Sequence, residues 1–195
     1  MQKVLVISFS DLARDSRVNR QLRFLREDHC VRAAGLADPA LDGVDFLPLR
    51  LLHNPRWRKL RAALLLACRC HETYYWSHAL IQDALARLSG VQADLIVAND
   101  LVTLPLALKL AGPVPVLFDA HEYAPREFDD SFVWRQLVQP HATALCRRYV
   151  PRVSAMLTVA PGIADAYEEL TGVRPVVMTN APDYEELSPR PAAAG

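Results

Sequence analysis

Short apolar runs recur along this chain, and segments with the periodicity of amphipathic helices separate them. The first run, KVLVISF at positions 3–9, is apolar on both alternating faces, as expected for a strand covered by helices on both sides. Because strands and helices alternate, we predict an α/β fold. It is a doubly wound, mostly parallel, Rossmann-like sheet with helices on both faces.

The same patterns locate the individual elements. Strands are expected at 3–9, 30–35, 44–48, 93–98, 113–118, 154–159 and 175–179. Helices are expected at 15–27, 56–88 with a break near 73–77, 101–110, 131–149 with a bend at Pro140, and 162–170. In the first helix Val18, Leu22 and Leu25 mark the buried stripe, and Arg17 falls largely outside it.

Polar residues follow the predicted strands, where the carboxyl ends of a parallel sheet meet at one edge and ligands bind. These residues are Ser10, Asp11 and Arg14, then Asn99 and Asp100, then Asp119, His121 and Glu122, and finally Asn180; Gly162, which opens a helix, follows the strand at 154–159 at the same edge. Turn formation accounts for Asn99, Asp100 and Asn180 without any ligand. It accounts less well for His121 and Glu122, because neither is a favoured turn residue.

Several ligand classes lack their sequence motif. Residues 8–16, SFSDLARDS, contain no glycine, which argues against a dinucleotide-binding loop or a P-loop. The four cysteines lack a sound metal-ligand spacing, so we expect reduced thiols, no metal and no cofactor. No signal peptide is recognisable, and the apolar helical run at 62–68 is too short to span a bilayer. We therefore expect a cytoplasmic location.

The charge is unevenly distributed. The net charge is zero, yet residues 1–78 hold thirteen Lys and Arg against eight Asp and Glu. Part of this excess lies at 54–66, NPRWRKLRAALLL, where Trp57, Leu60 and Leu64 share one helical face. Two interpretations stay open: peripheral contact with an anionic inner membrane surface, or a helix packed on the sheet with its arginines in water. No nucleic-acid binding is expected, because the neutral chain carries no recognisable binding motif.

Four stretches, in this order, resemble the N-terminal domain of glycosyltransferase family 4, whose enzymes have the GT-B fold. They are DSRVNRQLRFL at 15–25, DLIVANDLVTLPLALKLA at 94–111, VLFDAHEYAPREF at 116–128 and VSAMLTVAPGIADAYEELTGVRPVVMTNAPD at 153–183. The first is similar to the opening helix of members that lack a glycine-rich first loop. The third is similar to a strand that ends in a D-x-H-E element. Each stretch alone is a weak signal, but the four in order are fairly specific.

The resemblance implies a retaining transferase that moves a sugar from a nucleotide-sugar donor to a glycan, lipid-linked or small-molecule acceptor. His121 and Glu122 match the family's His-Glu element and would be the catalytic residues, facing a cleft between two domains. Asp119 would orient His121 or cap the following turn. Leaving-group charge would be stabilised by cationic side chains and backbone dipoles, without a metal.

The resemblance also implies binding roles for other residues. The loop with Ser10, Asp11 and Arg14 would approach the donor phosphates and the acceptor, and Arg14 or Arg17 would balance pyrophosphate charge. This sequence departs from the glycine-rich version of the loop, which weakens the expectation of close backbone approach to phosphate.

The resemblance divides the chain into a Rossmann-like N-terminal domain at 1–183 and a linker at 184–195. The linker would lead to a C-terminal donor-binding domain that this chain lacks, so we expect no sugar transfer by the chain alone. The rival interpretation is a flavodoxin-like domain that binds a phosphorylated ligand or a protein partner and has no transferase activity.

Overall fold

Seven parallel strands form the sheet within the described residues, in the order β3-β2-β1-β4-β5-β6-β7. The strands are β1 Lys3–Ile7, β2 Cys30–Gly35, β3 Val44–Pro48, β4 Leu95–Asn99, β5 Val116–Ala120, β6 Ala155–Thr158 and β7 Val176–Val177. This arrangement confirms the predicted doubly wound α/β fold. The strand order reverses direction between β1 and β4, and such a switch point opens a crevice at the carboxyl ends of the strands.

The structure is a computed structural model that describes residues 1–51, 55–181 and 186. The predicted linker at 184–195 lies outside the described residues except for Glu186, and so does residue 54 of the basic segment.

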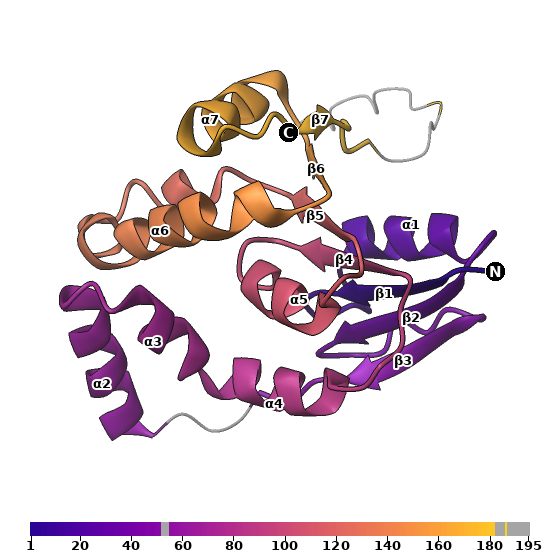
Figure 1. Cartoon of the computed structure of the whole chain (residues 1–195), viewed down its shortest axis with the longest axis horizontal. Helices are drawn as coiled ribbons and strands as arrows, with labels where there is room; N and C mark the ends of the chain where they lie inside the picture. The colour runs from indigo at the N-terminus through magenta and orange to yellow at the C-terminus, as the bar shows by residue number, and fades with distance from the viewer. Residues whose placement is uncertain (52–54, 182–185, 187–195) are drawn as a thin grey trace, which may run out of the picture.

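Helices cover both faces of the sheet, as Figure 1 shows for α1 and α5. The helices are α1 Ser16–Leu25, α2 Arg56–Ala67, α3 His71–Trp76, α4 Ala79–Leu88, α5 Leu104–Ala111, α6 Gln139–Tyr149 and α7 Pro161–Thr171, with short turns η1 Ala124–Arg126 and η3 Val150–Arg152. Val4 and Val6 of β1 pack with α1, whereas Leu5 and Ile7 belong to the larger core beneath α4, α5 and α6. The alternation of side chains along a strand therefore supplies both cores from one apolar run.

The helical stretch at 56–88 is interrupted twice. α3 ends at Trp76 and α4 begins at Ala79, so the break expected near 73–77 is found at 77–78, and a second break that was not predicted separates α2, which ends at Ala67, from α3. Arg69 has a left-handed backbone (φ 57°), and the Cys70 N–H donates to the Leu65 carbonyl at 2.8 Å. This is the hydrogen-bond pattern with which many helices end, usually at glycine. Cys68 and Cys70 consequently lie in a turn and not on a helix.

The bend expected at Pro140 takes the form of a π-helix, η2 (Trp134–Val138), that runs directly into α6. Pro140 has no N–H to donate to the carbonyl of Gln136 four residues earlier. The guanidinium of Arg69 donates to that carbonyl instead, at 3.2 Å. The α2–α3 turn thus supplies a donor to a carbonyl that cannot accept a hydrogen bond from Pro140.

Candidate functional site

The candidate site lies at the carboxyl ends of β4 and β5. Asn99 and Asp119 are register partners there, whereas the sequence placed both residues in loops beyond the strands. They are only 1% and 7% exposed. Asp100 follows in a left-handed conformation (φ 65°), which Asp tolerates better than most residues, and its N–H donates to the Asp119 carbonyl at 3.0 Å. The polar residues of these two strand ends are therefore packed together inside the protein.

Helix α1 supplies the partners of these buried groups. Its N-cap, Asp15, fixes the start of the helix through hydrogen bonds to two backbone N–H groups. Arg17 Nη2 then lies 3.1 Å from Asp119 Oδ1, with its side chain only 18% exposed. One turn later, Gln21 Nε2 donates to Asp119 Oδ2 at 3.1 Å and Gln21 Oε1 accepts from Asn99 Nδ2 at 3.0 Å. The expectation that Arg17 lies outside the buried stripe is wrong, because Asp119 draws it toward the sheet.

His121 follows β5 directly and is held by three side chains. Its Nε2 lies 3.1 Å from Asn99 Oδ1 and 3.7 Å from Asp119 Oδ2, and its Nδ1 lies 3.4 Å from Asp100 Oδ1. With 14% of its side chain exposed, the imidazole is largely enclosed in one orientation. Both ring nitrogens therefore face oxygen atoms of the protein.

The two carboxyl groups beside His121 differ in their pKa. Burial alone would raise the pKa of Asp119, but the hydrogen bond with His121 and the charge of Arg17 outweigh it and lower that pKa below its ordinary value. Neighbouring protein raises the pKa of Asp100 by burial, and the nearby His121 opposes part of this rise. The Asp100 side chain nevertheless remains 48% exposed. Asp119 is thus a fixed anion, whereas Asp100 stands at the border with solvent.

A cavity of about 310 Å³ opens beside His121. Its titratable lining residues are Asp100, His121, Glu122, Glu127, His141 and Tyr167. The Glu122 side chain is exposed, and its backbone carbonyl accepts a hydrogen bond from the Tyr167 hydroxyl at 3.0 Å. The cavity therefore brings together three of the residues selected from the sequence, namely Asp100, His121 and Glu122. Two more of them, Asn99 and Asp119, contact His121 from inside the protein.

The first loop does not join this cluster. Ser10 Oγ donates to the N-cap carboxylate of Asp15 at 2.7 Å. The Asp11 carboxylate accepts a hydrogen bond from the backbone N–H of Ala13 at 3.1 Å. The Arg14 side chain is 89% exposed, and its guanidinium is 3.8 Å from Asp11. Among the described residues, no hydrogen bond or ion pair connects Ser10, Asp11 or Arg14 with His121.

Gly162 and Asn180 also lie apart from His121. Gly162 is an exposed residue in the first turn of α7, with open space around its Cα. Asn180 accepts a hydrogen bond from Arg20 of α1 and borders a groove of about 430 Å³. Arg17 and Asp119 line the same groove. The Arg17–Asp119 pair thus faces the groove with Asn180, while Asp119 also approaches His121.

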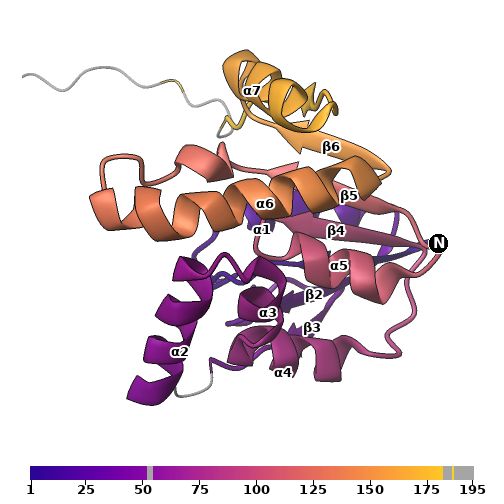
Figure 2. The ribbon, with the colours of Figure 1, turned by 60° about the vertical axis from the view of Figure 1, so that its left-hand side comes forward.

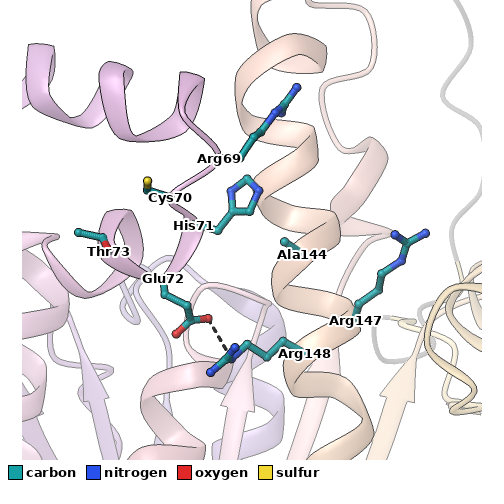
Figure 3. A pocket seen from close by; sticks show the side chains of 8 residues that line it. All are labelled: Arg69, Cys70, His71, Glu72, Thr73, Ala144, Arg147 and Arg148. Atoms are coloured by element: carbon teal, nitrogen blue, oxygen red, sulfur yellow. Dashed lines mark ion pairs between the residues drawn. The ribbon is translucent and has the colours of Figure 1, made fainter.

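A third cavity, of about 500 Å³, lies between the start of α3 and α6 and is drawn in Figure 3. Arginines 69, 147 and 148 line it, but Arg148 is paired with Glu72 at 3.2 Å. Figure 3 draws the guanidinium groups of Arg69, Arg147 and Arg148 apart from one another. The three guanidinium groups do not converge on one point, so the figure gives no anion site of fixed geometry.

Within residues 1–51, 55–181 and 186, no three His, Cys, Asp or Glu side chains gather as metal ligands. In the same part of the chain, no helix combines the length and the apolar character needed to cross a membrane. The four cysteines are free, and Cys146 is the buried one.

Comparison with known proteins identifies the fold. No family model and no curated protein sequence matches this chain. Among solved structures, Anabaena Alr3699/HepE in complex with UDP-glucose matches with a TM-score of 0.51 and 18% identity, over 94% of this chain and 45% of that chain. Sucrose-phosphate synthase from Thermosynechococcus elongatus matches with a TM-score of 0.53 and 14% identity, over 90% of this chain and 47% of that chain.

The fold is that of the GT-B glycosyltransferases. The glycotransferase of kitacinnamycin also matches, with a TM-score of 0.50 and 15% identity over 98% of this chain and 55% of that chain. This GT-B-like chain spans about half the length of the solved structures that it matches. At these identities the comparison establishes the fold alone, and membership of family 4 stays a prediction.

Four residues of the site were not selected from the sequence: Gln21, Glu127, Trp134 and His141. Gln21 carries a usable signal, because it lies four residues after Arg17 on the same face of α1. Glu127, Trp134 and His141 come from the segment after β5, from η2 and from α6. No local pattern relates these elements to the end of β5.

Proposed function

We propose that this chain is the N-terminal, acceptor-side domain of a retaining family 4 glycosyltransferase that uses a nucleotide-sugar donor. The observation that carries the proposal is the fixed position of His121, which follows β5 and lines a cavity in a GT-B fold. In such a sheet, ligands bind beyond the carboxyl ends of the strands.

His121 is the residue that we assign to the reacting centre, together with Glu122. Asn99 and Asp119 hold Nε2, and the longer contact, 3.4 Å from Nδ1 to Asp100, involves a half-exposed carboxylate. A substrate hydroxyl can displace that contact at little cost, so Nδ1 is the nitrogen that meets substrate. Asp119 acts through His121 as a positioning residue, and Arg17 keeps Asp119 ionised.

The donor phosphates are assigned to a second, C-terminal domain and to exposed groups of this chain. Arg14 is exposed and free to move toward an anion, with Ser10 and Asp11 beside it. The first turn of α7 presents Gly162 and backbone N–H groups, which favour negative charge. Asn180 lies close to the proposed linker. Arg17 is the exception: its pair with Asp119 makes it a support for the site and not a phosphate ligand.

Leaving-group charge is stabilised in this proposal by cations and backbone dipoles, with no metal ion and no other cofactor. The reaction requires both domains, because this chain corresponds to about half of each solved transferase. The isolated chain is therefore inactive, and a longer reading frame that includes a donor-binding domain is active.

The test is sugar transfer by the longest reading frame that contains this chain, assayed against a panel of nucleotide sugars. Transfer that is lost in His121→Ala and kept in a control variant supports the proposal. Robust turnover by residues 1–195 alone overturns the division into acceptor and donor domains. Binding of a phosphorylated ligand without any transfer by the long protein favours the flavodoxin-like alternative.

We also propose that α2 contacts an anionic membrane surface on the cytoplasmic side. Its apolar face is turned to solvent, since Trp57, Leu60 and Leu64 are 59%, 75% and 62% exposed. Figures 1 and 2 show α2 at the periphery of the molecule, away from the strands. From 46 to 71 the sequence holds six Lys and Arg residues and no Asp or Glu. A helix with an exposed apolar face and only cations around it suits an anionic lipid surface.

A further inference from the structure

The cavity beside His121 combines an apolar wall with negative charge. Leu101, Val102, Val138 and Leu145 contribute aliphatic surface, and Trp134 contributes an indole. The charged lining groups are the carboxylates of Asp100, Glu122 and Glu127, and the lining contains no lysine or arginine. Such a cavity favours ligands with a large apolar part and disfavours anionic ligands.

The carboxylates of this cavity repel one another. Glu127 is an exposed residue, but partial desolvation by neighbouring protein and the charges of Glu122 and Asp100 raise the pKa of its carboxyl group. The closest cation of this segment, Arg126, is directed elsewhere, to Asp129 at 2.6 Å. The negative charge at the cavity is therefore not neutralised by Arg126. A ligand that carries a further negative charge pays a Coulomb penalty there.

His141 supplies a polar group inside the same cavity. The residue is 8% exposed, and its Nδ1 has no hydrogen-bond partner among the described residues. Burial and the neighbouring His71 lower the pKa of His141 to about 4, so the ring is neutral near pH 7. A neutral imidazole both donates and accepts. A buried polar atom without a partner is uncommon. Because Nδ1 is covered by protein atoms, a ligand atom satisfies it only if the ring turns toward the cavity.

The indole of Trp134 lines the cavity. Trp134 belongs to the π-helix η2, a form that is often found at functional sites. Phe128, which is 52% exposed, packs against it edge-on with ring centroids 6.1 Å apart. Two aromatic rings thus extend the apolar wall from the cavity to the surface.

We propose that this cavity binds the acceptor and selects one with an apolar ring system, a hydroxyl group and no negative charge. The inference rests on the proposed function, because it takes His121 as the residue of the reacting centre. The apolar rings lie against Trp134 and the aliphatic wall, and a polar atom of the acceptor meets His141. The carboxylates exclude anionic acceptors and favour those that carry an amine.

The test uses three naphthalene probes of similar size: 2-naphthol, 6-(aminomethyl)-2-naphthol and 6-hydroxy-2-naphthoate. Binding to the chain is followed by NMR through the three tryptophan indole N–H signals, since the chain holds three tryptophans. The neutral and cationic probes are expected to shift the Trp134 signal. The signals of Trp57, on α2, and Trp76, which borders another cavity, are expected to stay in place. The anionic probe should bind at least about tenfold more weakly than the cationic one.

Substitutions locate the site and its selectivity. Trp134→Ala and His141→Phe are expected to weaken binding of the neutral probe, and Trp57→Ala is the matched tryptophan control. Glu127→Gln should reduce the preference for the cationic over the anionic probe, whereas Glu169→Gln, an exposed residue of α7, should not. If His141→Phe fails to fold, Trp134→Ala and Glu127→Gln decide the question.

Equal or stronger binding of the anionic probe overturns the inference, and so does binding that leaves the Trp134 signal unmoved. These outcomes are independent of the proposed function. If the long protein transfers sugar but no probe binds in this cavity, the proposed transferase function stands and the proposed acceptor class is rejected. If the probes bind as expected but the long protein transfers no sugar, the proposed selectivity of the cavity stands and the proposed transferase function is rejected.

Discussion

Arg17 and Asp119, which are 102 positions apart in the sequence, form an ion pair of 3.1 Å beneath the end of the sheet. The pair joins α1 to β5, and Asp119 lies 3.7 Å from His121. The ion pair therefore both holds α1 against the sheet and fixes the carboxylate that orients the His121 ring.

Arg17→Met is expected to destabilise the chain by about 3 kcal/mol. Removing one member of a buried pair leaves an uncompensated charge, here the Asp119 carboxylate. Urea unfolding measures the change. Arg14→Met is the matched control, because that side chain is 89% exposed, and its loss should cost less than about 1 kcal/mol. Equal effects of the two substitutions would contradict the buried pair, and Arg17→Met with Asp119→Leu should cost less than the sum of the single changes.

His141 is expected to make the free energy of unfolding fall as the pH is lowered from about 6.5 to about 4. Its native pKa is about 4, from burial first and from His71 second, whereas the unfolded value is near 6.5. In this window the unfolded state binds the proton and the native state does not. Stability is therefore lost on acidification, by about 3 kcal/mol once the pH is below both values.

His141→Phe serves as the comparison for this pH dependence. It keeps an aromatic ring between Tyr74 and His71, with which His141 packs, and removes the titrating group. The difference in unfolding free energy between the two proteins should grow as the pH falls from 6.5 to 4. A constant difference across that range shows that His141 is not buried in its neutral form.

His121→Ala in the long protein is expected to lower kcat for sugar transfer about a hundredfold or more, as for the loss of a residue at the reacting centre. His78→Ala is the control, since His78 is an exposed histidine at the start of α4. Circular dichroism and the melting temperature establish that both variants fold. An unchanged kcat in a folded His121→Ala enzyme removes His121 from the reaction.

Asp119→Asn is expected to lower kcat less than His121→Ala and to change its pH dependence. The substitution keeps the size of the side chain but removes the charge that faces Arg17 and His121. A residue that acts through His121 should alter the pH profile, whereas a purely structural residue should alter only stability. An unshifted profile in the folded variant contradicts the positioning role.

Substitution of the exposed face of α2 is expected to abolish binding to vesicles that contain anionic lipid. Trp57→Ser with Leu60→Ser and Leu64→Ser removes the apolar contact and leaves every cation in place. Co-sedimentation with phosphatidylglycerol vesicles at low and high salt measures the loss. Phe24→Ser on α1 is the control, because Phe24 is 76% exposed but lies outside α2. If the wild-type protein does not bind anionic vesicles at low salt, the proposed membrane contact of α2 is wrong.

The sequence by itself determined the architecture of the sheet. Hydrophobic periodicity is a local property, so it located each of the seven strands, and parallel pairing followed from the helices that separate most of them. β2 and β3 pair in parallel without a helix between them. It also placed Asp100, His121 and Glu122 at one edge, since strand ends of a parallel sheet share that edge. The boundaries were less accurate: Asn99 and Asp119 belong to the strands because pairing continues there, which no local pattern records.

Only the tertiary structure decided the contents of the site. The sequence predicts Arg17 as a surface residue of an amphipathic helix, but its side chain is only 18% exposed because a carboxylate of β5 compensates its charge. The turn at Arg69 and the π-helix before Pro140 are connected by one long-range hydrogen bond. Glu127, Trp134 and His141 meet beside His121 because α6 folds back over β5 (Figure 2). Hydrophobic periodicity shows which side of a helix or strand is buried. It does not show which residue of a distant segment packs against that side, because this depends on the tertiary fold.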